Sequence, residues 1–343
     1  MTRLTGIALL GAGRMGQVHA AAMAAAGARL VAVYDPVTRV ADALASRTGA
    51  AVAPSAAAAI HHAGVDAVVI ATSSDTHVEL VIEAVNAGKP VLCEKPLASS
   101  LAATRRCIAA IGDQAARQVF LGFNRRFDRG HAGLREAVHA GDIGRLEQLT
   151  ITSRDPLPPP LEYVPRSGGL FRDMMIHDFD MARGILRQEL VSVTAHGSSI
   201  VDPEIGKLGD IDTASVTLLA EDGAIVTILN SRRCAFGFDQ RIEAFGADGM
   251  VVSDNPRQSG LTRYRPGYPG TPAPILEFFM ERYGESYAAE IRLFLDCVRE
   301  GRDMPVNAYD GLMAAYLAEA ATLSLKLGKT IHLTGPDQEF DHV

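Results

Sequence analysis

Three ionisable side chains recur along a short segment at spacings that could support acid-base chemistry. The segment reads SGGLFRDMMIHDFD from Ser167 to Asp180, and in it Asp173, His177 and Asp180 are separated by four and three residues. In a helix such spacings place side chains on one face. A histidine exchanges a proton near neutral pH, and a neighbouring carboxylate fixes its tautomer. We therefore expect one helix that presents His177 beside Asp173, with Asp180 either orienting the ring or serving the structure.

A glycine motif near the N-terminus predicts a site for a dinucleotide. Gly11, Gly13 and Gly16 form the pattern GxGxxG directly after an expected strand and at the start of an expected helix. The first glycine permits the turn, the second lets the backbone approach a pyrophosphate, and the third allows close packing of helix and strand. Asp35 ends the second strand, where a carboxylate binds ribose hydroxyls and disfavours the 2′-phosphate of NADP. The motif therefore predicts NAD.

Further polar residues follow later strands of the same region. Ser73, Ser74 and His77 come after the expected strand 67–70, where capping of the next helix also explains them. Glu94 and Lys95 follow the expected strand 90–93, and a lysine there could stabilise negative charge on a substrate oxygen. Because ligands of such sheets lie at the carboxyl ends of strands, we expect these residues near the cofactor or substrate.

The elements that must position these residues follow two different rhythms. In the first third, short β-branched runs alternate with alanine-rich helical stretches, which predicts an α/β fold with a doubly wound parallel sheet. The expected strands are 7–10, 30–34, 67–70, 90–93 and 119–122. After Phe123 the alternation stops, and the pattern predicts a second α/β part with a mostly antiparallel sheet. Its expected elements are helix 130–140, strand 146–153, strands 214–220, 224–230 and 241–246, and closing helices 275–299 and 309–327.

Composition narrows the class of protein. The chain has 343 residues, of which 48% are hydrophobic and 21% charged, enough for two buried cores. A net charge of −7 without basic clusters argues against a nucleic-acid partner. We expect no membrane span and no secretory leader. The four cysteines lack metal-ligand spacing and indicate reduced thiols in a cytoplasmic protein (Cys93, Cys107, Cys234 and Cys297).

These motifs together resemble a known family. GxGxxG with an acidic residue after the second strand, Glu94-Lys95-Pro96 after the expected strand 90–93, and a glycine pair followed by DxxxHxxD resemble the glucose-fructose oxidoreductase, inositol dehydrogenase and rhizopine catabolism (Gfo/Idh/MocA) family over nearly the whole chain. Four longer strings are similar to the inositol dehydrogenases of that family: ITSRDP from Ile151, FRDMMIHDFDMAR from Phe171, GDIDTA from Gly209 and NSRR from Asn230.

The resemblance implies a Rossmann domain over residues 1–122, followed by a substrate-binding and oligomerisation α/β domain over 123–343 with a large open sheet. It implies that Lys95, Asp173 and His177 are catalytic and that the chain forms a homotetramer. Arg126 and Asp155 match family positions near the substrate. The residues expected at NAD are Gly11, Gly13, Arg14, Met15, Gly16, Asp35, Ser73, Ser74, His77 and Glu94.

The implied reaction is the NAD-dependent oxidation of a cyclic polyol, with myo-inositol converted to 2-keto-myo-inositol (scyllo-inosose). One departure leaves the polyol open, because Phe236-Gly237-Phe238-Asp239 stands where inositol dehydrogenases often read YGYD. The alternatives are a dehydrogenase for another inositol isomer or a pyranose sugar, a metal-dependent hydrolase or lyase using Asp173, His177 and Asp178 or Asp180, and a non-enzymatic NAD-binding sensor.

Overall fold

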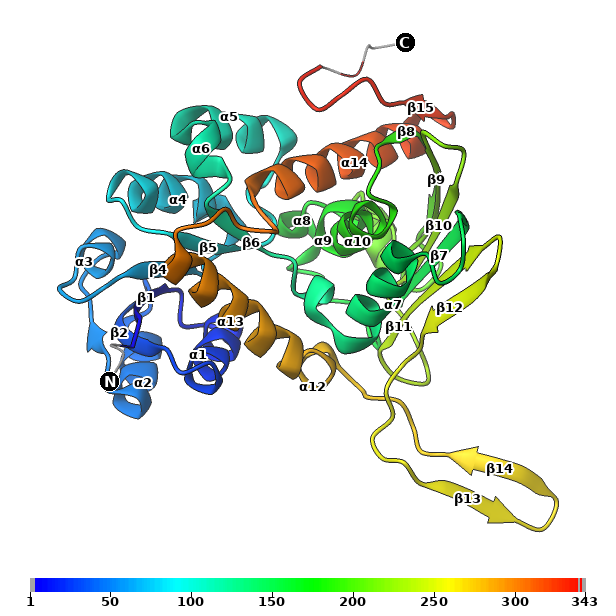
Figure 1. Ribbon diagram of the computed structural model, residues 1–343, viewed down its shortest axis with the longest axis horizontal. Helices are drawn as coiled ribbons and strands as arrows, with labels where there is room; N and C mark the ends of the chain where they lie inside the picture. Colours follow the sequence, from blue (N-terminus) through cyan, green and yellow to red (C-terminus); the bar gives the residue numbers. More distant parts are fainter. Residues whose placement is uncertain (1–3, 339, 341–343) are drawn as a thin grey trace. The chain divides into compact units, whose positions relative to one another are not determined.

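The computed structural model describes residues 4–338 and 340 (Figure 1). The chain divides into two compact units, of which the first comprises residues 1–127 and 284–316 and the second residues 128–283 and 317–343. The outermost residues of both expected domains, 1–3 and 341–343, lie outside the described residues, as does residue 339. That residues 1–122 fold as a domain of their own stays a prediction.

The first unit contains a six-stranded parallel sheet in the order β3-β2-β1-β4-β5-β6. The strands are β1 (Gly6–Leu10), β2 (Arg29–Tyr34), β3 (Ala51–Val52), β4 (Ala67–Ile70), β5 (Val91–Glu94) and β6 (Val119–Gly122). The expected doubly wound sheet is therefore confirmed. The sequence missed β3, since two exposed residues at a sheet edge give no periodic signal.

The order reverses between β1 and β4, so the crossover helices lie on opposite faces of the sheet. Figure 1 shows α1 and α2 on one side and α4 and α5 on the other. The helical segments of this unit are α1 (Arg14–Ala25), α2 (Thr38–Thr48), α3 (Ala56–Ile60), η1 (Ser74–Thr76), α4 (His77–Asn86), α5 (Leu101–Ile111), α6 (Asp113–Ala116), η2 (Asn124–Phe127) and α13 (Gly284–Glu300). The late helix α13 packs against α1 and η2.

The second unit contains a seven-stranded mixed sheet in the order β12-β11-β7-β10-β9-β8-β15. Its strands are β7 (Leu146–Arg154), β8 (Leu190–Ser198), β9 (Thr213–Ala220), β10 (Ile225–Ser231), β11 (Asp239–Gly246), β12 (Gly249–Ser253) and β15 (Ile331–His332). All neighbours pair antiparallel except β10 and β7. The expectation of a mostly antiparallel sheet is confirmed.

Alternation along these strands gives the sheet two different faces. One face forms a hydrophobic core with α7 (Arg129–Ala140), α10 (Ile176–Leu186) and the later part of α14 (Ala308–Leu327). The other face exposes apolar side chains that lie beside each other across strand pairs, Leu219 with Ile225 and Phe245 with Met250. The remaining helices of this unit are α8 (Val164–Ser167), α9 (Leu170–Asp173), α11 (Pro203–Lys207) and α12 (Phe279–Arg282).

The expectation of one long helix from residue 275 is wrong. Ile275 forms an isolated bridge with Arg257, and the Phe238 amide donates to the Leu276 carbonyl at 3.0 Å, so this segment is extended. Helix formation begins only with α12 and continues in α13. Residues 254–278 also contain a separate hairpin of β13 (Thr262–Arg265) and β14 (Tyr268–Pro272), which the sequence did not predict.

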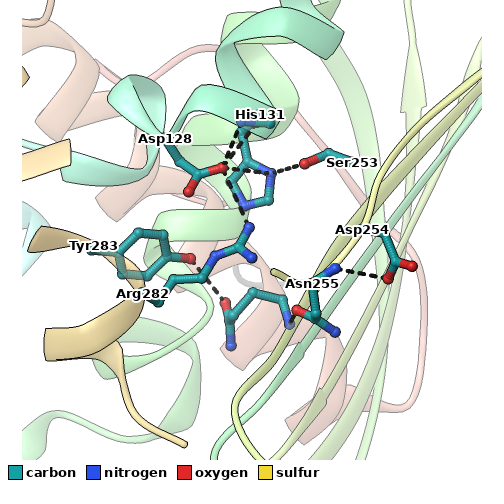
Figure 2. Close-up of polar contacts among 9 residues, drawn as sticks. Asp128, His131, Ser253, Asp254, Asn255, Arg282 and Tyr283 are labelled. Atoms are coloured by element: carbon teal, nitrogen blue, oxygen red, sulfur yellow. Dashed lines mark hydrogen bonds and ion pairs between the residues drawn. The ribbon is translucent and has the colours of Figure 1, made fainter. Parts of the chain in front are cut away.

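A polar cluster joins the two ends of the segment that carries this hairpin (Figure 2). Asp128 caps α7 by accepting from the amides of Gly130 and His131, and its Oδ1 lies 3.3 Å from Nη2 of Arg282. The His131 ring bonds to the Ser253 hydroxyl at 2.8 Å. Because Ser253 precedes the segment and Arg282 follows it, the cluster fixes both ends on α7.

Candidate active site

The glycine turn after β1 has the geometry that a dinucleotide needs. Gly11 has a φ of +92°, and a Cβ on it would lie 2.5 Å from the Ala71 carbonyl oxygen. A Cβ on Gly16 would lie 2.1 Å from the Gly11 oxygen. A Cβ on Gly13 would meet no protein atom within 4 Å. The first and third glycines are therefore required by the fold, whereas the space at Gly13 is left for a ligand at the start of α1, which fits NAD.

Asp35 is fixed beside this turn. One carboxylate oxygen accepts from the Ala12 amide and the other from the Val37 amide, both at 2.8 Å. Each oxygen keeps a lone pair for a ribose hydroxyl. Arg39 lies on the exposed part of α2. The acidic residue expected after the second strand therefore lies at the nucleotide turn.

The residues after β4 and β5 are joined through His77. Its Nδ1 lies 2.8 Å from the Pro96 carbonyl and its Nε2 3.2 Å from the Thr72 carbonyl. Burial lowers the pKa of His77, so the ring is neutral and has one N–H, which the shorter contact assigns to Nδ1. His77 thus holds the loop of Lys95 and Pro96, which are linked by a cis peptide bond. Ser73 is exposed and Ser74 partly exposed in the preceding turn.

Asp173 and His177 belong to two helices, so the expectation of one helical face shared with Asp180 is wrong. Asp173 ends α9, and His177 lies in the first turn of α10. Met174, Met175 and Ile176 are all buried, which a straight helix with one buried face does not allow. Asp173 and His177 are partly exposed, whereas Asp180 is 1% exposed and turned into the core.

Contacts within the second unit orient the Asp173 carboxylate. Its Oδ1 accepts from the Tyr163 hydroxyl at 3.0 Å, and its Oδ2 lies 3.3 Å from Nη1 of Arg232. Arg232 is buried after β10 and also contacts Asp210 at 3.5 Å. The sequence did not single out Arg232 or Tyr163, since their roles depend on distant segments meeting.

Asp178, next to His177, has a structural environment. It is fully buried and accepts from the Ser153 hydroxyl at 2.6 Å and the Asn230 amide at 2.8 Å. These bonds tie the first turn of α10 to β7 and β10. The neighbouring His177 is thereby held at a defined place on the sheet.

The two residues expected near the substrate differ in their surroundings. Arg126 on η2 is nearly buried and pairs with Asp310 at 2.9 Å. Asp155 follows β7 and is partly exposed, and its amide donates to the Ser231 carbonyl. Phe238 stands where inositol dehydrogenases often have a tyrosine, and its side chain is buried in the core. Its ring packs edge-on against Tyr283 with centroids 5.9 Å apart. Phe236 is exposed.

Possible metal ligands, the cysteines and the helix lengths bear on the other functions and locations that the sequence left open. Within the described part of the chain, no three His, Cys, Asp or Glu side chains are arranged to hold a metal ion. The four cysteines are buried free thiols. No helix among the described residues is long and apolar enough to cross a membrane.

Comparison with known proteins agrees with this architecture. A family model described as an oxidoreductase family with an NAD-binding Rossmann fold matches residues 5–123, and the GFO/IDH/MocA C-terminal domain matches residues 131–252. Inositol 2-dehydrogenase of Rhizobium meliloti is 45% identical over 318 residues, covering 92% of this chain and 96% of that protein.

Two solved structures share the fold along their length. A myo-inositol dehydrogenase from Corynebacterium glutamicum superposes with a TM-score of 0.94 at 42% identity, covering 97% of this chain and all of the other. A scyllo-inositol dehydrogenase from Lactobacillus casei, solved with NAD(H) and scyllo-inositol, gives 0.89 at 27% identity, covering 97% and 100% of the two chains. The chain therefore belongs to the Gfo/Idh/MocA family of NAD-dependent oxidoreductases.

Proposed function

We propose that this protein oxidises one ring hydroxyl of myo-inositol to a ketone, which gives 2-keto-myo-inositol (scyllo-inosose), with NAD as the oxidant. The observation that carries the proposal is that one chain holds both an open nucleotide turn at Gly13 and a partly exposed His177, which follows by four residues an Asp173 that Tyr163 and Arg232 orient. Relatives named inositol and myo-inositol dehydrogenases, similar over nearly the whole chain, support the substrate class.

In this mechanism His177 accepts the proton of the reacting hydroxyl. As the O–H bond breaks, Lys95 stabilises the negative charge that develops on the oxygen. Asp173 accepts a hydrogen bond from an adjacent hydroxyl. When bound, NAD would accept a hydride from the carbon that carries the reacting hydroxyl. The electron pair of that C–H bond leaves with the hydride, the hydroxyl proton passes to His177, and a C=O bond forms.

The residues that would hold NAD surround the strand ends of the first unit. Gly11, Gly13 and Gly16 shape the turn for the pyrophosphate, with Arg14 and Met15 at the start of α1. Asp35 would bind the ribose hydroxyls and disfavour NADP. Ser73, Ser74, His77 and Glu94 would line or support the nicotinamide side.

The runner-up is another inositol isomer or a pyranose sugar, with Arg126 and Asp155 proposed near the substrate in either case. The relative named scyllo-inositol dehydrogenase favours this alternative, and Phe238 offers no phenol to a polyol. The test is formation of reduced nicotinamide from NAD with myo-inositol, other inositols and pyranoses. A myo-inositol kcat/KM above the others supports the proposal, and absence of turnover with every polyol contradicts it.

We also propose a homotetramer that uses the open face of the second unit's sheet. Exposed Leu219, Ile225, Phe245 and Met250 form apolar pairs on that face, and apolar surface of this kind favours association. Light scattering of the purified protein tests the assembly.

We also propose a cytoplasmic location, which the four buried free thiols favour.

A further inference from the structure

Three ionisable side chains of the first unit occupy its interior and take no part in the proposed transfer of proton and hydride. His19 lies on α1, three residues after Gly16; Glu94 ends β5 directly before Lys95; and Glu290 lies on α13. His19 and Glu290 are completely buried and Glu94 is 7% exposed. Burying ionisable groups is costly unless their hydrogen bonds are satisfied, so this grouping requires a physical reason.

Hydrogen-bond distances connect two of the three side chains to Lys95. His19 Nε2 lies 2.7 Å from Glu94 Oε1, and Glu94 Oε2 accepts from the Lys95 amide at 3.1 Å. Although burial alone would raise the pKa of Glu94, the hydrogen bond and charge of His19 and the charge of Lys95 lower it. The ionised carboxylate only accepts hydrogen bonds, so Nε2 of His19 carries a proton. Nδ1 is buried without a partner.

Glu290 supplies the complementary group. Both of its carboxyl oxygens are buried without a hydrogen-bond partner. Tyr287, one turn earlier on α13, packs edge-on against the His19 ring with centroids 5.7 Å apart, and residues three apart share a helix face. Burial, together with the negative charge of Glu94, raises the pKa of Glu290 well above its ordinary value. The carboxyl is therefore neutral and carries one O–H donor.

We propose that Glu290, His19 and Glu94 form a buried hydrogen-bond relay that positions Lys95. The Glu290 O–H donates through one internal water to His19 Nδ1; the His19 Nε2–H donates to Glu94; and Glu94 holds the Lys95 amide. The relay joins the helix that begins at the nucleotide turn, the loop of Lys95 and α13. The role of Lys95 rests on the proposed function, whereas the protonation states of Glu290 and Glu94 do not depend on it. All three members are positioning residues.

Infrared spectroscopy tests the protonation of Glu290 without any activity. At about pH 8, where ordinary carboxyl groups are ionised, the wild type should show the carbonyl band of a protonated carboxyl. The band should be lost in Glu290→Gln and kept in Glu300→Gln, which alters an exposed glutamate of the same helix. Equal spectra for the wild type and Glu290→Gln would overturn the relay.

Turnover tests the positioning of Lys95. Glu290→Leu should lower kcat by about tenfold or more with little change in the dissociation constant of NAD, because small displacements of a reacting group cost rate. Glu290→Gln keeps a neutral donor and should restore most of that loss, while Glu300→Leu should match the wild type. A folded Glu290→Leu with wild-type kcat, or a Gln variant as impaired as Leu, would overturn the relay. Absence of turnover in the wild type with the carboxyl band present would instead overturn the proposed function.

Discussion

The Asp173 carboxylate and the Arg232 guanidinium lie 3.3 Å apart, although 59 residues separate them in the sequence. Arg232 is 1% exposed and also faces Asp210, so one buried cation lies between two carboxylates of the second unit. The Asp210 carboxylate in turn accepts from the Leu170 amide at the start of α9. The orientation of a predicted catalytic residue therefore depends on Arg232, which was not itself among the predicted site residues.

Arg232→Met should impair both stability and activity. Removing the cation takes one charged contact from both Asp173 and Asp210, and removing one partner of a buried ion pair costs about 3–5 kcal/mol of unfolding free energy. We expect a lower Tm and a lower kcat/KM for inositol. Arg232→Lys keeps the charge but loses the planar fork, so its defect should be intermediate. Equal kcat/KM for the wild type and a folded Arg232→Met would refute this role for Arg232.

Asp178→Leu should destabilise the protein through the anchor of α10. The change removes two buried hydrogen bonds, from the Ser153 hydroxyl and from the Asn230 amide, and the loss of a buried hydrogen bond costs about 1–3 kcal/mol. Chemical denaturation should show the midpoint falling without a change in slope. Asp178→Asn retains one acceptor oxygen and should lose less. A midpoint that does not move in Asp178→Leu would contradict the anchor.

Gly13→Ala and Gly16→Ala should separate cofactor binding from folding. An added Cβ at Gly13 meets no protein atom, so this variant should fold normally and bind NAD at least tenfold more weakly, about 1.4 kcal/mol or more. An added Cβ at Gly16 would lie 2.1 Å from the Gly11 oxygen, so that variant should lose thermal stability even without NAD. Calorimetry with NAD and thermal melts measure the two effects. Unchanged NAD affinity in Gly13→Ala would place the nucleotide elsewhere.

Asp35→Ser should weaken the preference for NAD over NADP. The carboxylate beside the Ala12 amide would repel a 2′-phosphate, and serine removes that charge. The measurement is the ratio of kcat/KM with NAD to that with NADP, which should fall by about tenfold or more. A wild-type protein that prefers NADP would contradict the role of Asp35 outright.

The stability of Glu290→Gln should depend on pH differently from that of the wild type. Because the pKa of Glu290 is raised in the folded protein, the folded chain binds more protons than the unfolded chain above the ordinary glutamate pKa of about 4.3. The unfolding free energy of the wild type therefore falls as pH rises between the unfolded and folded pKa values, and glutamine abolishes that fall. The Tm difference in favour of Glu290→Gln should grow from about pH 4 to about pH 8. A difference independent of pH would mean that Glu290 is ionised when folded.

Local patterns predicted much of the frame that carries the site. The strands of the first sheet and the glycine turn are short-range features, and β4 and β6 have the expected bounds. Asp35 was predictable because its place follows from the glycine turn and the end of β2. The cis bond between Lys95 and Pro96 was not predicted, because a proline in the sequence does not show which isomer the fold selects.

The remaining features depend on contacts between distant segments. The break between α9 and α10 follows from three consecutive buried residues, and a sequence does not show which residues a sheet will cover. Arg232, Asp210 and Tyr163 meet Asp173 from separate loops. Glu290 looks like an ordinary helix glutamate until α13 packs against α1, where its carboxyl becomes buried.

The most direct test of the central claim is turnover by His177→Ala. With NAD and myo-inositol, kcat should fall by about 10² to 10⁴, as expected for loss of a general base, while NAD affinity stays at the wild-type value. His196→Ala, which alters an exposed histidine of β8 in the same unit, serves as the control and should match the wild type. A kcat of His177→Ala near that of the wild type would contradict the account.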